Sequence, residues 1–140
     1  MDPNCIFCKI VAGQIKAQTV YEDDHVIAFL DTAPIFPGHT LVAPKQHYLT
    51  MMDLPPQMLQ PLFSVAQTIC RAVEKGLDAH GSFVAINNKI SQSVPHLHVH
   101  VIPRKAKDGM KGFFWPRRPY KDQDEMTATA SAIRSAISGA

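Results

Sequence analysis

Short apolar runs separated by turn residues predict three strands in the first third of the chain. Residues 20–21 and 26–30 flank the acidic turn at 22–24, and residues 39–43 follow the break at Pro37-Gly38. Apolar runs separated by so few turn residues are typical of strands that pair antiparallel. We therefore expect an antiparallel sheet to begin here.

The next segment changes to a helical period. Apolar side chains recur every three or four residues between Leu59 and Val73 and include Cys70, which we expect to be buried. Segment 53–56 contains two prolines, which are typical of the first turn of a helix, and Gly76 is typical of a helix end. The pattern predicts one long helix, with one face packed on the sheet.

The second half of the chain predicts two more strands and a second helix. The strands are expected at 82–86 and 97–102, and an Ala- and Ser-rich segment at 127–137 has helical period after an acidic start. The order strands, helix, strands, helix favours an α+β fold with an antiparallel sheet, one long central helix and a C-terminal helix over a doubly wound parallel sheet.

Composition narrows the class of protein further. The 140 residues are 46% hydrophobic and 19% charged, which fits a single globular domain. We expect residues 1–104 to form its body and 105–140 a C-terminal loop and helix. A net charge of +2 argues against binding to a nucleic acid duplex. The sequence predicts no membrane span and no signal peptide, so we expect a cytoplasmic protein.

Three histidines at period two are the strongest chemical feature. His96, His98 and His100 alternate with aliphatic residues, so a strand would place all three imidazoles on one face and the aliphatic side chains in the core. Such a set can chelate zinc and activate a water. Alternatively, one imidazole attacks a phosphoryl centre and forms a covalent nucleotidyl-histidine. The period alone does not choose between the two chemistries.

A polar stretch just upstream favours the phosphoryl reaction. Asn87, Asn88, Gln92 and Ser93 offer amides, a hydroxyl and backbone N–H groups to a phosphate at the mouth of the histidine strand. The same composition is also typical of an ordinary turn.

Two of the three cysteines, Cys5 and Cys8, have the spacing of half a zinc site. A second Cys-x-x-Cys pair does not follow in the sequence, so two further ligands must come from elsewhere. The alternative is a pair of reduced thiols without a metal.

These motifs together resemble a known family. The pattern His-φ-His-φ-His-φ-φ at 96–102 is the signature of the histidine-triad (HIT) nucleotide-binding superfamily, and segments 5–10, 28–31 and 37–47 are similar to its other motifs in the same order. The chain is identified as a member of the prokaryotic Hint-like branch.

The resemblance implies a homodimer with a HIT-like fold in which each subunit binds a purine nucleotide such as AMP or a nucleotidyl conjugate. It implies that His98 is the nucleophile, with His96, His100 and His39 completing the catalytic set and His100 and His39 flanking the phosphate. The implied substrate-binding residues are Ile6, Phe7, Ile10 and Phe29 for the base, Asp31 for the ribose, and Asn87, Asn88, Gln92 and Ser93 for the phosphate or leaving group.

The resemblance also completes the metal site. In members with this N-terminus, one zinc ion is held by the two cysteines and two histidines, which here are Cys5, Cys8, His47 and His96. A closed Cys₂His₂ site is structural and does not activate water.

The expected activity is cleavage of purine nucleoside 5′-phosphoramidates or related nucleotidyl conjugates through nucleotidyl-His98, with release of a nucleoside monophosphate. One alternative is a dinucleoside polyphosphate hydrolase, which the basic and aromatic segment at 105–121 keeps open. Another is a nucleotide-binding or partner-binding module without catalysis. A third is a metallohydrolase that uses all three histidines.

Overall fold

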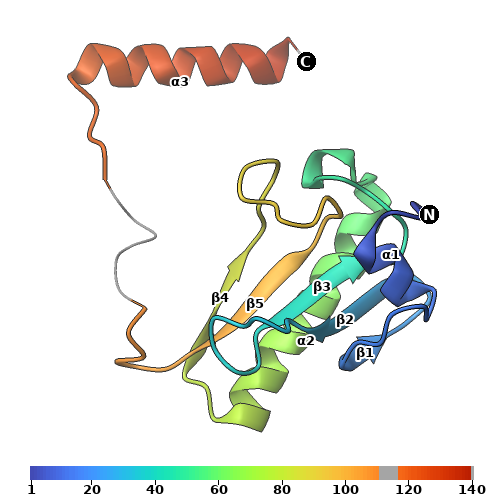
Figure 1. The fold of residues 1–140 in the computed structure, drawn as a ribbon. Helices are drawn as coiled ribbons and strands as arrows, with labels where there is room; N and C mark the ends of the chain where they lie inside the picture. Colours follow the sequence, from blue (N-terminus) through green and yellow to red (C-terminus); the bar gives the residue numbers. More distant parts are fainter. Residues whose placement is uncertain (111–116, 140) are drawn as a thin grey trace. The chain divides into compact units, whose positions relative to one another are not determined.

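The computed structural model describes residues 1–110 and 117–139 (Figure 1). They belong to two compact units, Met1–Asp108 and Gly109–Ala140. The sequence predicts a single domain whose body ends at Arg104, and this interpretation stays a prediction. Phe113, Phe114 and Trp115, which belong to the basic and aromatic segment at 105–121, lie outside the described residues.

The first unit is built on a five-stranded antiparallel sheet, as the sequence predicts. Its strands lie in the order β1-β2-β3-β5-β4. Their bounds are β1 Thr19–Glu22, β2 Val26–Leu30, β3 Thr40–Pro44, β4 Gly81–Ala85 and β5 Val99–Arg104. With the long helix α2 (Leu59–Leu77) and the C-terminal helix α3 (Gln123–Ser138), this confirms the α+β class.

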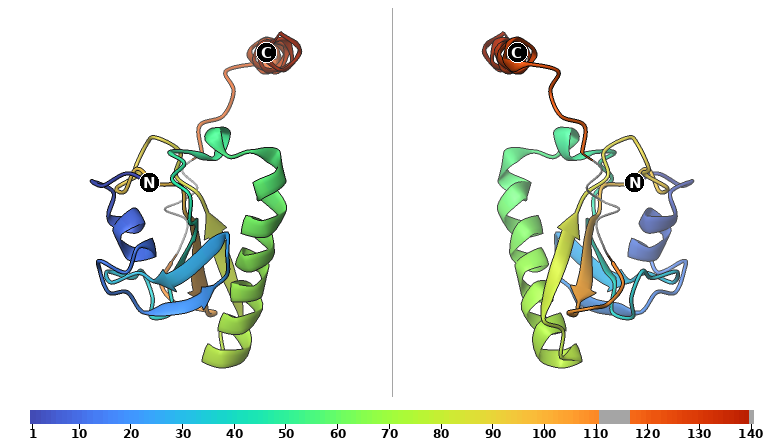
Figure 2. Two further views of the ribbon diagram at one scale, coloured as in Figure 1. Left: turned by 90° about the vertical axis from the view of Figure 1, so that its right-hand side faces the viewer. Right: turned by 90° about the vertical axis from the view of Figure 1, so that its left-hand side faces the viewer.

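The sheet is covered on both faces, by α2 on one side and by the short helix α1 (Ile6–Val11) on the other (Figure 2). The alternation along β2 explains this burial: Val26 and Ala28 pack in the cluster beneath α2, while Ile27 and Phe29 pack with α1. Because successive side chains point to opposite faces, a strand covered on both faces is apolar throughout.

Helix α2 starts later than the sequence suggests. Two 3₁₀ turns, Met51–Asp53 and Pro56–Met58, precede it. The residue before a proline is biased away from helical dihedrals, and Pro55 itself is extended, with ψ of 144°. The helix passes Gly76 and ends at Leu77, where Asp78 adopts a left-handed conformation with φ of 54°.

The other two helices also differ from the expectation. The sequence analysis predicts no helix at residues 6–11, because six residues are too few for a helical period to be read. Helix α3 begins at Gln123 instead of 127, since the Asp122 carboxylate caps it by accepting from the Glu125 amide at 2.8 Å. Over the described ranges, the molecule has no helix with the length and apolarity needed to cross a membrane.

Strand β5 begins two residues later than predicted, at Val99. Its pairing with β3 stops at Val42↔Val99. If the same register continued, Leu97 would lie opposite Pro44, which has no N–H to donate. His96 and His98 are therefore in a segment without regular secondary structure before the strand, and only His100 is on β5.

Candidate active site and metal cluster

The three triad histidines still lie on one side of their segment. Val99 and Val101 enter the apolar cluster beneath α2, and the Phe7 ring of α1 packs edge-on against the opposite side. The centroid of that ring lies 5.7 Å from His96 and 5.0 Å from His98. The His98 and His100 rings are 4.8 Å apart. The triad thus shares the α1 face of the sheet.

The His98 ring is held by a bond within its own segment. Its Nδ1 lies 2.7 Å from the carbonyl oxygen of His96. A carbonyl only accepts, so Nδ1 carries the proton and the neutral imidazole has its lone pair on Nε2. Burial lowers the pKa of His98 below its ordinary value, which favours this neutral form at pH 7. His98 therefore presents a nucleophilic nitrogen.

His100 has the opposite tautomer because of a chain of bonds through His39. The Ile35 amide donates to His39 Nδ1 at 3.1 Å, so the proton of neutral His39 is on Nε2. That Nε2–H donates to His100 Nδ1 at 2.9 Å. His100 is then left with its proton on Nε2. Burial lowers the pKa of His39, and burial aided by its two histidine neighbours lowers that of His100 to about 4.

The imidazoles of His98 and His100 both line one cavity of about 320 Å³. The cavity is also lined by six residues that were predicted to bind the substrate. They are Ile6, Phe7, Ile10 and Phe29 for the base, Asp31 for the ribose, and Ser93 for the phosphate or leaving group. His39 does not line this cavity and is only 3% exposed, so its connection to the cavity runs through its hydrogen bond to His100.

Asp31 both shapes its turn and faces the cavity. Its Oδ1 accepts from the Ala33 amide at 2.9 Å, which is a turn cap, and Oδ2 lies 3.8 Å from His39 Nδ1. The side chain is 24% exposed and lines the cavity, so its carboxylate can still accept from a hydroxyl.

The other predicted phosphate-binding residues lie outside this cavity. Asn88 Oδ1 accepts from the Met51 amide at 2.9 Å, and the Gln92 amide group bonds the Leu49 carbonyl and the Lys89 N–H. These side chains hold the 88–92 loop against the chain at 49–51. Asn87 does not line the cavity either.

The cavity is also lined by residues that were not predicted as site residues, among them Ile15, Lys16 and Val94. Ile15 and Lys16 follow α1 in an irregular stretch without period, so no pattern marks them. Val94 precedes Pro95 and gives no signal of its own.

A second cluster lies beside the triad. The ligand atoms of Cys5, Cys8, His47 and His96 lie within 4.8 Å of one another, and three of the four residues are buried. His96 Nε2–H donates to the Pro44 carbonyl at 2.8 Å, which leaves the lone pair of Nδ1 directed at the cluster. Burial lowers the pKa of His96 to about 4, so the ring is neutral and able to bind a metal.

The spacing of these atoms fits a zinc ion. Tetrahedral bonds of about 2.3 Å to sulfur and about 2.0–2.1 Å to nitrogen separate neighbouring ligand atoms by about 3.3–3.8 Å. His96 Nδ1 lies 3.3 Å from Cys5 Sγ, 3.6 Å from Cys8 Sγ and 3.2 Å from His47 Nδ1. Cys8 Sγ lies 3.4 Å from His47 Nδ1. Two thiols and two imidazoles are also the donor set of closed structural sites.

The geometry does not support a metal held by the three triad histidines. His96 belongs to the cysteine cluster, and His100 groups with Asp31 and His39. His98 is in neither group. Hydrogen bonds from Ile35 and His39 already use the lone pairs of His39 Nδ1 and His100 Nδ1.

Comparisons with known proteins agree with this fold. The family model "HIT domain" matches residues 12–107. The protein hit of Bacillus subtilis is 38% identical over 135 residues, which are 94% of this chain and 93% of that protein. The crystal structure of a zinc-bound histidine triad family protein from Mycobacterium smegmatis has a TM-score of 0.74 and 36% identity, and the match covers 95% of this chain and 97% of that one.

The chain belongs to the HIT domain family. Members of this family are generally nucleotide-binding hydrolases or transferases. Among the relatives is adenylylsulfatase HINT3 of Arabidopsis thaliana, which is 36% identical over 107 residues that cover 75% of this chain and 54% of that protein.

Proposed function

We propose that the protein cleaves purine nucleoside 5′-phosphoramidates or related nucleotidyl conjugates through a covalent intermediate on His98. The observation that carries this proposal is the pair of opposite tautomers in one cavity: His98 offers a lone pair at Nε2, and His100 offers an N–H. A nucleophile beside a donor for a phosphoryl oxygen is the arrangement that phosphoryl transfer requires.

The reaction has two displacements. His98 Nε2 attacks the α-phosphorus and forms a P–N bond, while the bond to the leaving group breaks and the leaving group departs with the electron pair of that bond and takes a proton from solvent water. Water then attacks the same phosphorus, the P–Nε2 bond breaks, and the nucleoside monophosphate leaves. The water proton is lost to solvent or to a base, and His98 regains its neutral form.

The neighbouring groups contribute orientation and charge stabilisation. The His96 carbonyl keeps the proton of His98 on Nδ1, so that the reacting nitrogen stays unprotonated. His100 Nε2–H donates to a nonbridging phosphoryl oxygen as negative charge grows there. His39, through its bond to His100, is a positioning residue.

The cavity suits a purine nucleoside monophosphate unit. Ile6, Ile10 and Phe29 give it an apolar wall for the base, and the Asp31 carboxylate accepts from ribose hydroxyls. The name of the Arabidopsis relative, an adenylylsulfatase, supports an adenylyl group as the transferred unit, with an acidic leaving group as a second class beside amines.

Release of AMP from adenosine 5′-phosphoramidate tests this proposal. We expect turnover to persist in a chelator for as long as the chain stays folded, because a metal in the cluster would not contact the reacting atoms. If AMP binds the protein but neither this substrate nor a diadenosine polyphosphate is cleaved, the chain is a nucleotide-binding module.

We also propose that the Cys5–Cys8–His47–His96 cluster holds one zinc ion, whose role is to link α1 to the histidine segment. The spacing, the neutral His96 and the zinc-bound relative support it. The ligand thiols must stay reduced, which favours a reducing compartment such as the cytoplasm. Native mass spectrometry should find one zinc per chain, and Cys8→Ser should lose it. A purified wild-type chain that binds no added zinc would contradict the assignment.

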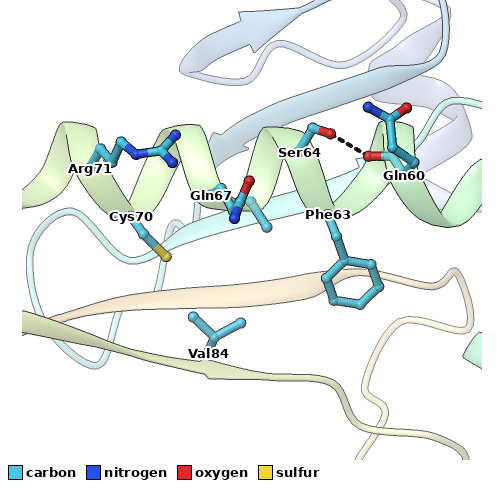
Figure 3. A pocket seen from close by; sticks show the side chains of 8 residues that line it. Gln60, Phe63, Ser64, Gln67, Cys70, Arg71 and Val84 are labelled. Carbon is cyan, nitrogen blue, oxygen red and sulfur yellow. Dashed lines mark hydrogen bonds between the residues drawn. The ribbon is translucent and has the colours of Figure 1, made fainter.

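We further propose that two copies associate through β4 and α2 to form the homodimer that family resemblance implies. In the part of the sheet that the structure describes, β4 is an edge strand and Val84 on it is 44% exposed. A cavity of about 540 Å³ lies between α2 and this strand, with Phe63, Cys70 and Arg71 above Val84 (Figure 3). Cys70 is only partly buried there, in contrast to the full burial expected. An edge strand beside an apolar hollow is a natural pairing surface for a second copy.

Sedimentation of two edge-strand variants tests the dimer. Val84→Asp should shift the protein to monomer, while Val20→Asp on the opposite edge strand β1, where Val20 is 51% exposed, should not. Equal behaviour of the two variants would rule out this interface.

A further inference from the structure

His96 belongs to two sites at the same time. Its imidazole Nδ1 faces Cys5, Cys8 and His47, and its backbone carbonyl accepts the Nδ1–H of His98 at 2.7 Å. The residue is fully buried, and its Nε2–H is fixed by the Pro44 carbonyl. His96 therefore connects the two sites: its ring belongs to the metal cluster, and its own carbonyl bonds the proposed nucleophile.

Helix α1 makes a second connection between the same two sites. It has six residues, and a helix of this length is not stable by itself in water. Cys5 caps it by accepting from the Cys8 amide, and between these two cysteines Phe7 packs edge-on against both His96 and His98. Ile6, Phe7 and Ile10 of this helix also line the nucleotide cavity. The cluster thus holds a wall of the cavity in place.

We infer that occupancy of the cluster by a metal and occupancy of the cavity by a nucleotide are coupled, with His96 and α1 as the connection. This inference rests on the proposed nucleotide and zinc sites. A ligated His96 has a fixed ring and carbonyl, and the fixed carbonyl holds the side chain at position 98, which lines the cavity, in one orientation. The metal touches neither the nucleotide nor the reacting atoms, so His96 is a positioning residue in this role.

Coupling between two binding sites is reciprocal. If zinc raises the affinity for AMP by some factor, AMP raises the affinity for zinc by the same factor. Couplings of this kind are typically about five-fold or more. The affinity for zinc is therefore a readout that requires no catalysis.

The experiment measures the zinc dissociation constant of the full chain by competition with a chromogenic chelator, with and without saturating AMP. We expect AMP to tighten zinc binding by about five-fold or more. Failure of the zinc-loaded chain to bind AMP overturns the proposed nucleotide site itself. Binding of AMP without any change in zinc affinity overturns only the coupling.

Two variants of His98 separate this path from a general effect on folding. In His98→Asn the side-chain amide N–H takes the place of Nδ1–H and still donates to the His96 carbonyl, whereas His98→Ala has no donor. We expect AMP to tighten zinc binding in the Asn variant nearly as in the wild type, and clearly less in the Ala variant. Equal coupling in both variants, which is also the result if the metal-free chain simply unfolds, overturns the connection through His96.

Discussion

The two faces of the sheet bury their side chains for different purposes. The cluster beneath α2 is built from apolar residues such as Leu62, Leu97 and Val99. The face beneath α1 combines apolar residues such as Phe7 and Phe29 with the buried rings of His96 and His98. A buried polar group is tolerated when it is hydrogen-bonded, and both of these rings are. The α2 face therefore contributes mainly to stability. The α1 face orients the histidine rings of the proposed reaction, and each buried ring there needs a hydrogen-bond partner.

The largest expected effect is on the rate, from the α1 face. His98→Asn removes the nucleophile and should lower AMP release from adenosine 5′-phosphoramidate by about a thousand-fold or more, while AMP affinity and the free energy of unfolding change little. The matched control is His25→Asn, an exposed histidine in the β1–β2 turn, which should retain the wild-type rate. Substantial turnover by the His98 variant would exclude the covalent mechanism.

A substitution on the α2 face should lower the stability of the protein and leave the reaction rate unchanged. Leu62 is fully buried, so Leu62→Ala should reduce the free energy of unfolding by about 2–5 kcal/mol and leave the rate per folded molecule unchanged. Leu59 on the same helix is 37% exposed, and Leu59→Ala should cost less than about 1 kcal/mol. Urea unfolding together with AMP release checks both variants. A rate loss for Leu62→Ala in folded protein would show that the two faces are not independent.

A smaller effect is expected at His39, which acts through His100. His39→Ala should lower the rate by about a hundred-fold through misplacement of the His100 ring, with little change in AMP affinity. His39→Gln retains a side-chain N–H near the position of Nε2 and should recover part of the rate. The ratio of the two rates is the measurement, and equal losses would contradict a positioning role.

The smallest effect is a pH dependence of stability that belongs to the α1 face. The pKa of His100 is lowered to about 4, against about 6.5 in the unfolded chain. Between these values the unfolded chain binds a proton that the folded chain does not, so stability is full above about pH 6.5 and falls as the pH decreases, by up to about 1.4 kcal/mol per pH unit.

Urea unfolding of the wild type and His100→Asn at pH 7.5 and pH 5 checks this dependence. Asparagine can accept from His39 Nε2–H without titrating, so the variant should lose less stability on acidification than the wild type. Identical losses in the two proteins would show that His100 is not responsible.

The sequence predicts the sheet well, because period-two and period-3.6 patterns record which side chains are buried. It also predicts the two groups of chemistry-bearing residues that the fold brings together, Cys5–Cys8–His47–His96 and His98–His100–Asp31. Residues so far apart in sequence could be grouped only because the family resemblance supplied their roles.

The parts that the sequence does not reveal depend on backbone groups. The Ile35 amide sets the tautomer of His39, the Pro44 carbonyl sets that of His96, and neither signal is carried by a side chain. The missing N–H of Pro44 likewise ends the pairing of β5 before His98. Asn88 and Gln92 have the right chemistry for a phosphate, but their amides are used by the loop that contains them.

The central claim is that His98 becomes covalently nucleotidylated. Intact-protein mass spectrometry after a rapid quench with adenosine 5′-phosphoramidate measures this directly, with His98→Asn as the matched control. The proposed mechanism predicts an adenylyl adduct on the wild-type chain, mapped to His98 by fragmentation and absent from the variant. AMP release by the wild type with no adduct at any quench time, or with an adduct on another residue, would contradict it.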